Sequence, residues 1–109
     1  MILNIYNKKE VVKTYKVDSY DIMFGVLEDV SNAVKIDEMK SGSNEEIAKA
    51  VINLVTNSLD TVKDLLKDIF DGITDEEIRC TRVSEIVQVF IDVVTYTIKA
   101  MRRNINPKN

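Results

Sequence analysis

The side chain best suited to covalent chemistry in this sequence is Cys80, the single cysteine among 109 residues. Arg79 and Arg82 stand close to it, and neighbouring cations favour the thiolate, which is the nucleophilic form of cysteine. A cysteine nucleophile also needs a general base, most often histidine, and the chain contains no histidine. One cysteine supplies neither a zinc-binding spacing nor an internal disulfide. We therefore expect a protein that is not an enzyme, in a reducing compartment.

Acidic residues gather in the second half of the chain, but their spacing does not match a metal motif. A calcium loop needs alternating ligands followed by a distal glutamate, and that pattern is missing. The three glycines are far apart and form no phosphate-binding loop. We expect no metal and no cofactor, and we interpret the acids as a solvated face. They are Asp60, Asp64, Asp68, Asp71, Asp75, Glu76 and Glu77.

Composition limits the class of protein further. The length fits a single domain, expected over 1–103 and followed by a flexible tail at 104–109. Fifteen Lys and Arg against 18 Asp and Glu give a net charge of −3, which argues against nucleic acid as a partner. The sequence has no apolar run long enough to cross a membrane and no signal-peptide pattern. We expect a cytoplasmic protein.

The elements that must position these residues are mainly helical. Two short β-branched and aromatic segments, 2–6 and 11–17, flank a polar turn and predict an N-terminal β-hairpin. An isolated hairpin is marginally stable, so it must pack on the rest of the domain. Apolar residues at spacings of three and four then predict helices at about 19–35, 44–70 and 83–103.

The expected helices differ in how clear their signals are. The first should begin at a cap at Asp18 or Ser19 and end near Lys35. The last is rich in β-branched residues, so a strand over 87–97 is the alternative, although length and spacing favour the helix. The buried stripe expected for the first helix comprises Tyr20, Met23, Phe24, Leu27, Val30 and Val34.

Capping signals mark where the helices begin and end. Ser43 and Glu46 have the spacing of a capping box before the helix at 44–70. Gly72 suits a left-handed position after that helix. Thr74 and Glu77 form a second capping-box pattern, which opens a short helical turn near 75–79.

Both long helices carry apolar stripes that are wider than a surface helix needs. Either neighbouring elements cover both sides of these helices, or a flanking row stays exposed as a groove for a partner helix or for self-assembly. The candidate partner-binding residues are those of the flanking rows: Ile52, Leu59, Leu66 and Phe70 in one helix, and Val89, Val93 and Tyr96 in the other.

Two segments of the sequence, 65–77 and 82–87, resemble the small tail assembly chaperones of long-tailed (siphovirus-type) phages and prophages of Gram-positive bacteria. The predicted hairpin and residues 17–25 are also similar to this family. The most specific part is the turn Phe-x-Gly-x-Thr-x-Glu-Glu at residues 70–77. Asp71 stands where related proteins often carry proline, which should loosen the turn.

The resemblance implies a non-enzymatic role in virion assembly. Proteins of this family bind the tape measure protein, keep it soluble and help to recruit tail tube subunits, and they are absent from the mature virion. Many also exist in a longer form made by ribosomal frameshifting, which is thought to contact the tube protein. The resemblance thus implies a homo-oligomer in the host cytoplasm, with the tape measure and tube proteins as partners and neither nucleic acid nor membrane.

Two other functions remain open from the residues themselves. One is a self-associating adaptor or regulatory protein of a mobile element. The other is an inhibitor of a host factor. All three readings rest on more apolar surface than the chain can bury alone.

Overall fold

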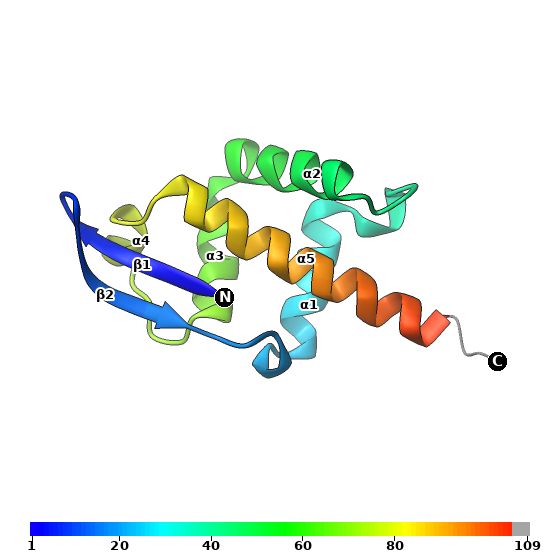
Figure 1. Ribbon diagram of the computed structural model, residues 1–109, viewed down its shortest axis with the longest axis horizontal. Helices are drawn as coiled ribbons and strands as arrows, with labels where there is room; N and C mark the ends of the chain where they lie inside the picture. The colour runs from blue at the N-terminus through cyan, green and yellow to red at the C-terminus, as the bar shows by residue number, and fades with distance from the viewer. Residues whose placement is uncertain (106–109) are drawn as a thin grey trace.

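The computed structural model describes the backbone of residues 1–105 and the side chains of residues 1–100. The expected class, mainly helical with an N-terminal hairpin, is confirmed (Figure 1). The last part of the predicted tail, 106–109, lies outside the described residues. The elements are β1 (Ile2–Asn7), β2 (Glu10–Lys16), a 3-10 turn η1 (Ser19–Asp21), α1 (Phe24–Val34), a 3-10 turn η2 (Ile36–Glu38), α2 (Asn44–Asn57), α3 (Leu59–Ile69), α4 (Asp75–Arg79) and α5 (Val83–Ile105).

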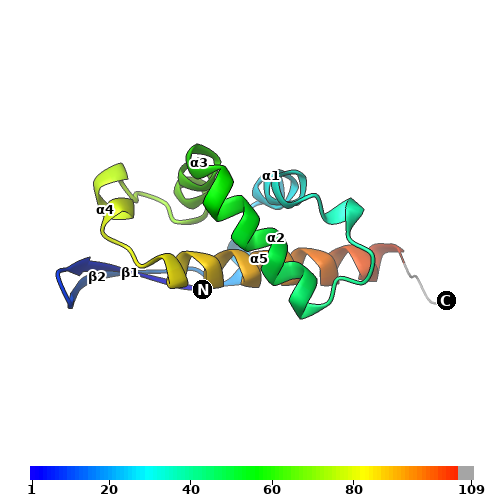
Figure 2. The same cartoon turned by 90° about the horizontal axis from the view of Figure 1, so that it is seen from above.

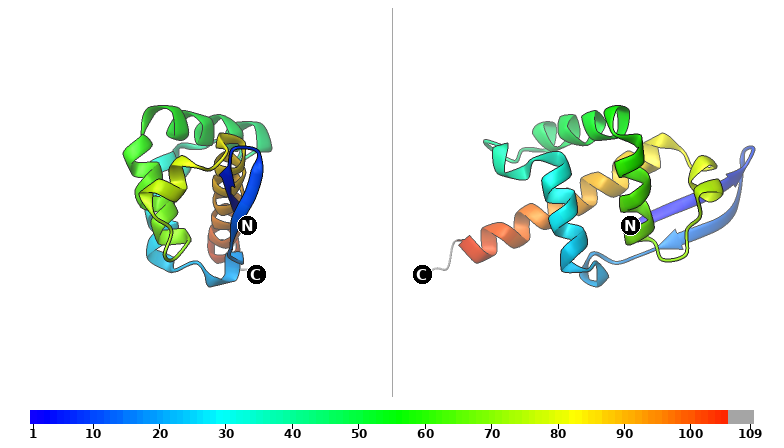
Figure 3. Two further views of the ribbon diagram at one scale, coloured as in Figure 1. Left: turned by 90° about the vertical axis from the view of Figure 1, so that its left-hand side faces the viewer. Right: turned by 180° about the vertical axis from the view of Figure 1, so that it is seen from behind.

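The elements are arranged around α5, which runs along the long axis of the molecule (Figure 1). Seen from above, the hairpin and α5 lie in one layer, α1, α3 and α4 lie in a second, and α2 crosses α5 (Figure 2). Helices α1 and α3 contact each other and lie side by side on one face of α5, the face turned toward the viewer on the right of Figure 3. Helix α5 contacts α1, α2 and β1, so its sides are covered by different neighbours.

The hairpin forms as predicted and is anchored through β1. The strands are antiparallel, with a bulge where the pairing passes from Ile5 to Tyr6. On the side away from β2, the backbone N–H of Asn4 donates to Glu85 at 3.0 Å, and the N–H of Tyr6 donates to the carbonyl of Cys80 at 2.8 Å. The inward side chains of Leu3 and Ile5 are buried. The hairpin therefore packs against α5 and the segment before it, as expected because a hairpin is only marginally stable by itself.

The first helix begins later than predicted. An α-helix from residue 19 is wrong, because residues 19–21 form a 3-10 turn and Met23 is the N-cap of α1. The end is correct: α1 stops at Val34, and Lys35 takes the left-handed conformation with φ of 56°. The buried face of α1 is Val26, Val30 and Val34, spaced by a helical turn.

The single helix expected over 44–70 is two helices, which meet at Ser58. The backbone dihedral angles of Ser58, φ −138° and ψ 60°, lie outside the helical range. The hydrogen bonds continue on both sides, since Ser58 N–H donates to Leu54 and Val62 N–H donates to Ser58. A straight helix of this length would extend about 40 Å. The break instead turns the apolar faces of α2 and α3 toward the same core.

Helix α5 settles the ambiguity over 87–97 in favour of the helix and continues to Ile105, past the expected end at 103. The short turn at α4 forms where predicted. Helix α5 buries residues on adjoining rows because β1 lies against one side of it and α1 and α2 against others. The buried Thr97 satisfies its hydroxyl by donating to the carbonyl of Val93 at 2.7 Å. Along α5 the buried residues are Ile86, Val89, Phe90, Val93, Val94, Thr97 and Ile98.

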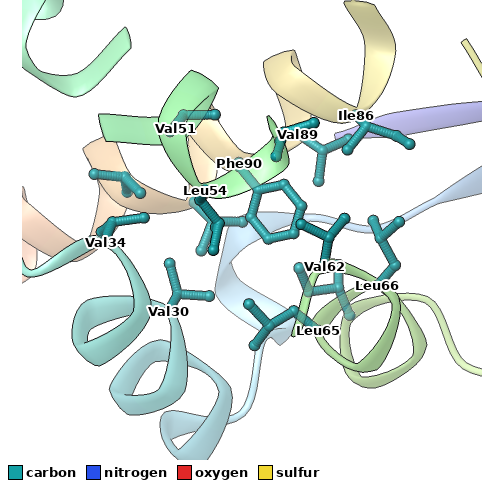
Figure 4. Packing of buried hydrophobic residues seen from close by; sticks show 14 of the residues in the cluster. Val30, Val34, Val51, Leu54, Val62, Leu65, Leu66, Ile86, Val89 and Phe90 are labelled. Carbon is teal, nitrogen blue, oxygen red and sulfur yellow. The ribbon is translucent and has the colours of Figure 1, made fainter. Parts of the chain in front are cut away.

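The core lies where α5 meets α1, α2 and α3. Phe90 is fully buried, and its ring lies at the centre of this core (Figure 4). Around it lie Val30 of α1, Leu54 of α2 and Leu65 of α3 (Figure 4). Residues from four helices thus meet in one cluster, which fixes how α1 lies relative to α5.

Candidate functional site

Four of the seven residues expected to bind a partner lie in the core. Leu66, Phe70 and Val93 have no exposed surface, and Val89 is 1% exposed. The expectation of an exposed row is wrong for these four, because the hairpin and the neighbouring helices cover both sides of the wide stripes. Tyr15 of β2, for example, packs on Phe70 with ring centroids 6.2 Å apart.

The other three predicted residues reach the surface at separate places. Ile52 of α2 is 50% exposed, and Leu59, the first residue of α3, is 63% exposed. Tyr96 of α5 is half-buried and meets the ring of Tyr20 edge to face, with centroids 6.4 Å apart. Tyr96 thus belongs to the surface where α5 meets η1. Partner binding by these three residues stays a prediction.

The largest exposed apolar side chains are ones that sequence reasoning placed in the core. Tyr20 is 87% exposed, Met23 75% and Phe24 74%. They were assigned to a buried stripe because the helix was expected to begin at residue 19. Tyr20 and Met23 lie before α1, which begins at Phe24, so the helical periodicity does not extend back to these two residues. Phe24 lies within α1 but off its buried face, which is formed by Val26, Val30 and Val34. We call Tyr20, Met23 and Phe24 the 20–24 patch.

A groove between α1 and the C-terminal half of α5 adjoins the 20–24 patch. It has a volume of about 410 Å³. Phe24 and Leu27 supply apolar surface on the α1 side, and Ala100 does so on the α5 side. Glu28 and Ser31 add polar atoms along the α1 side. An exposed aromatic residue beside a mixed groove is the arrangement in which an amphipathic helix can lie.

The capping box at Thr74 is confirmed and also holds the hairpin. The Glu77 N–H donates to the Thr74 hydroxyl at 3.1 Å, and the Glu77 carboxylate accepts from the Thr74 N–H at 3.1 Å. The same carboxylate accepts from the Tyr15 hydroxyl at 2.7 Å and from Lys13 at 3.0 Å. These bonds, that from Tyr15 first, lower the pKa of Glu77 to about 2. Glu77 therefore ties β2 to α4.

The predicted box at Ser43 forms only in part. The Ser43 hydroxyl accepts from the Glu46 N–H at 3.2 Å, as expected. The Glu46 carboxylate, however, reaches past Ser43 to the backbone N–H groups of Lys40, Ser41 and Gly42, at 2.9, 3.0 and 2.8 Å. These bonds lower the pKa of Glu46 to about 2, with the Lys40 bond the largest cause. Glu46 thus closes the loop before α2 as well as capping the helix.

Gly72 has the backbone conformation that the sequence predicted, with φ of 89°. It follows the end of α3, where Phe70 is the C-cap, and it precedes the Thr74 cap of α4. The turn between two helices therefore places its one left-handed residue at a glycine.

The described side chains, residues 1–100, contain no group of three or more His, Cys, Asp or Glu placed to hold a metal ion. Within that part of the chain, no helix is long and apolar enough to span a membrane. No protein-family profile, curated protein or solved structure matches the chain.

Proposed function

We propose that this protein is a non-enzymatic tail assembly chaperone that binds the tape measure protein of a long-tailed phage or prophage. The resemblance of residues 65–77 and 82–87 to that family supports the proposal. The structural observation that carries it is the exposed 20–24 patch beside the α1–α5 groove. A tape measure protein is long and helical, and an apolar groove with polar edges can cover its apolar stripe and keep it in solution.

The remaining roles belong to the same proposal. The protein acts in the host cytoplasm, is absent from the mature virion and helps to recruit tail tube subunits through a longer, frameshifted form. Many weak contacts along one client chain would add up through avidity.

Co-expression with a tape measure segment tests the proposal. The wild-type chain should raise the soluble yield of the segment and co-purify with it. The Met23→Ser/Phe24→Ser double variant should fold normally, because both side chains are largely exposed. It should bind the segment roughly tenfold or more weakly, as expected for loss of an aromatic anchor. Val83→Ser, which removes a similarly exposed apolar side chain (62% exposed) from the first position of α5, is the matched control and should bind normally.

Each result has a defined reading. No gain in soluble yield with the wild-type chain would refute the chaperone function. Normal binding by a folded double variant would show that the groove is not the client site.

A self-associating adaptor is the second candidate. It is favoured by the outer strand β2, where Val11 is 50% and Val12 61% exposed. Within the described residues no further strand pairs with β2, so its outer edge is open to another chain. Size measurement of the isolated chain separates the two: stable self-assembly together with indifference to a tape measure segment would favour the adaptor.

A further inference from the structure

Three cationic side chains surround a pocket between the hairpin turn and the start of α5. Lys8 projects from the turn, while Arg79 and Arg82 flank the segment that joins α4 to α5. This end of the molecule lies opposite the C-terminal end of α5 (Figure 1). The pocket has a volume of about 290 Å³, and its lining residues are Tyr6, Lys8, Arg79, Cys80, Thr81 and Arg82.

The walls of this pocket are held together by three contacts of Tyr6. Its backbone N–H donates to the carbonyl of Cys80 at 2.8 Å, which joins β1 to the 79–82 segment. Its hydroxyl donates to Glu85, which holds the ring in place. The guanidinium of Arg82 lies 4.2 Å from the centre of the Tyr6 ring. A cation stacked on a fixed ring loses little further freedom when it binds a ligand.

Among the described side chains, the three cations form no ion pair with an acid. The ion pairs among the described side chains are Lys13 with Glu77 and Lys67 with Asp75. Neither pair includes a residue of the pocket. Both pairs involve acids of α4, Glu77 and Asp75.

The acidic groups close to the pocket offset part of its positive charge. The carboxylate of Glu85 already accepts hydrogen bonds from the Tyr6 hydroxyl and the Asn4 N–H. Glu76 is the remaining acid of α4 and is exposed. The N-terminus of α5 begins at Val83 and adds a partial positive charge. A positive pocket thus lies on a chain whose net charge is −3.

We propose that this pocket binds the carboxylate side chains of an acidic segment of a partner protein. Two guanidinium groups and an ammonium group suit carboxylate oxygens, because the arginine fork can donate two parallel hydrogen bonds. The cations cluster at one pocket of an acidic chain and form no extended basic stripe, which disfavours nucleic acid. The inference is independent of the chaperone function, since the pocket and the α1–α5 groove have no lining residue in common.

The experiment records the NMR chemical shifts of the backbone amides of the full chain while oligoglutamate is added at low salt. A parallel titration with oligoglutamine provides the neutral counterpart. The expected shifts concentrate at Tyr6, Lys8 and 79–82, weaken with added salt and are absent with oligoglutamine. Arg79→Gln and Lys8→Gln should each weaken binding roughly two- to fivefold, in the range of an exposed charge contact. Both side chains are exposed, so the folded state should persist.

Lys49→Gln is the matched control, because it removes the same charge from an exposed position on α2. It should leave the affinity unchanged. An equal loss with this variant would overturn the proposal in favour of a general charge effect. So would an absence of shifts with oligoglutamate, or shifts at these amides with inorganic phosphate alone. The chemical shift changes of the wild-type chain test the proposal without any variant. The test therefore remains valid even if one of the variants fails to fold.

Discussion

At the scale of single residues, Glu77 joins two elements through one carboxylate. Its carboxylate caps α4 and accepts hydrogen bonds from Tyr15 and Lys13 of β2. Because these bonds favour the charged form, the pKa falls from the usual 4.5 to about 2. The hairpin and α4 are therefore joined through a group whose charge can be removed by acid.

Stability should decrease on acidification, and Glu77→Gln should reduce that decrease. A carboxyl with a lowered pKa stabilises the fold fully above its unfolded pKa, near 4.5, and loses that effect as the pH falls toward about 2. Glu46 titrates over the same interval and should retain its own contribution. Denaturation midpoints measured from pH 6 to pH 2 test this expectation. An identical pH profile for the variant and the wild type would contradict it.

Two of the three glycines, Gly25 and Gly72, should respond oppositely to alanine. An added Cβ meets no atom within 4 Å at either position, so packing does not distinguish them. Gly72→Ala should destabilise by about 1–2 kcal/mol, because φ at this residue is 89°. Gly25→Ala, in the first turn of α1, should stabilise by up to about 1 kcal/mol. Chemical denaturation measures both, and a neutral Gly72→Ala would rule out the left-handed conformation.

At the scale of elements, the structure differs from the sequence prediction mainly in which apolar rows of the helices are covered by neighbouring elements. Helix α5 buries adjoining rows because β1 and the helices pack on different sides of it. The break at Ser58 brings α2 and α3 to the same core, and it leaves Leu59 exposed at the first position of α3. Periodicity identifies the faces of a helix, but it does not show how many of them have a neighbour.

Leu59→Asp and Val93→Asp should therefore differ sharply in stability. Leu59 is 63% exposed in the first turn of α3, where an acid suits the helix dipole, so the change should stay within about 0.5 kcal/mol. Val93 is completely buried, and an unpaired carboxylate there should cost roughly 3 kcal/mol or more. Thermal and urea unfolding of both variants provide the measurement. Similar losses would mean that Leu59 also lies in a packed interface.

At the scale of the whole molecule, the hairpin and the helical body are joined near the N-terminus of α5. Glu85 accepts from the Asn4 N–H and the Tyr6 hydroxyl, and the Cys80 carbonyl accepts from the Tyr6 N–H. These contacts occupy the free side of β1 and leave β2 as the outer strand. The molecule consequently has two chemically different ends, a cationic pocket near the hairpin turn and an apolar groove beside the C-terminal half of α5.

Glu85→Ala should loosen the hairpin more than it unfolds the helices. The variant leaves one backbone and one side-chain donor without their acceptor, which costs on the order of 1–3 kcal/mol. Hydrogen exchange should accelerate at the amides of β1 and change little in α2. Asp68→Ala, at an exposed position on α3, is the control and should stay within about 0.5 kcal/mol. Equal acceleration in β1 and α2 would show global destabilisation instead.

Local features could be read directly from the residues. The hairpin, the capping box at Thr74 and the left-handed Gly72 were predicted correctly, because each depends on side chains and backbone within a few positions. The break at Ser58 and the burial of Val89 and Val93 required the folded arrangement. The exposure of the 20–24 patch required it too. Burial is a property of contacts between elements distant in sequence, and an amphipathic pattern describes one element alone.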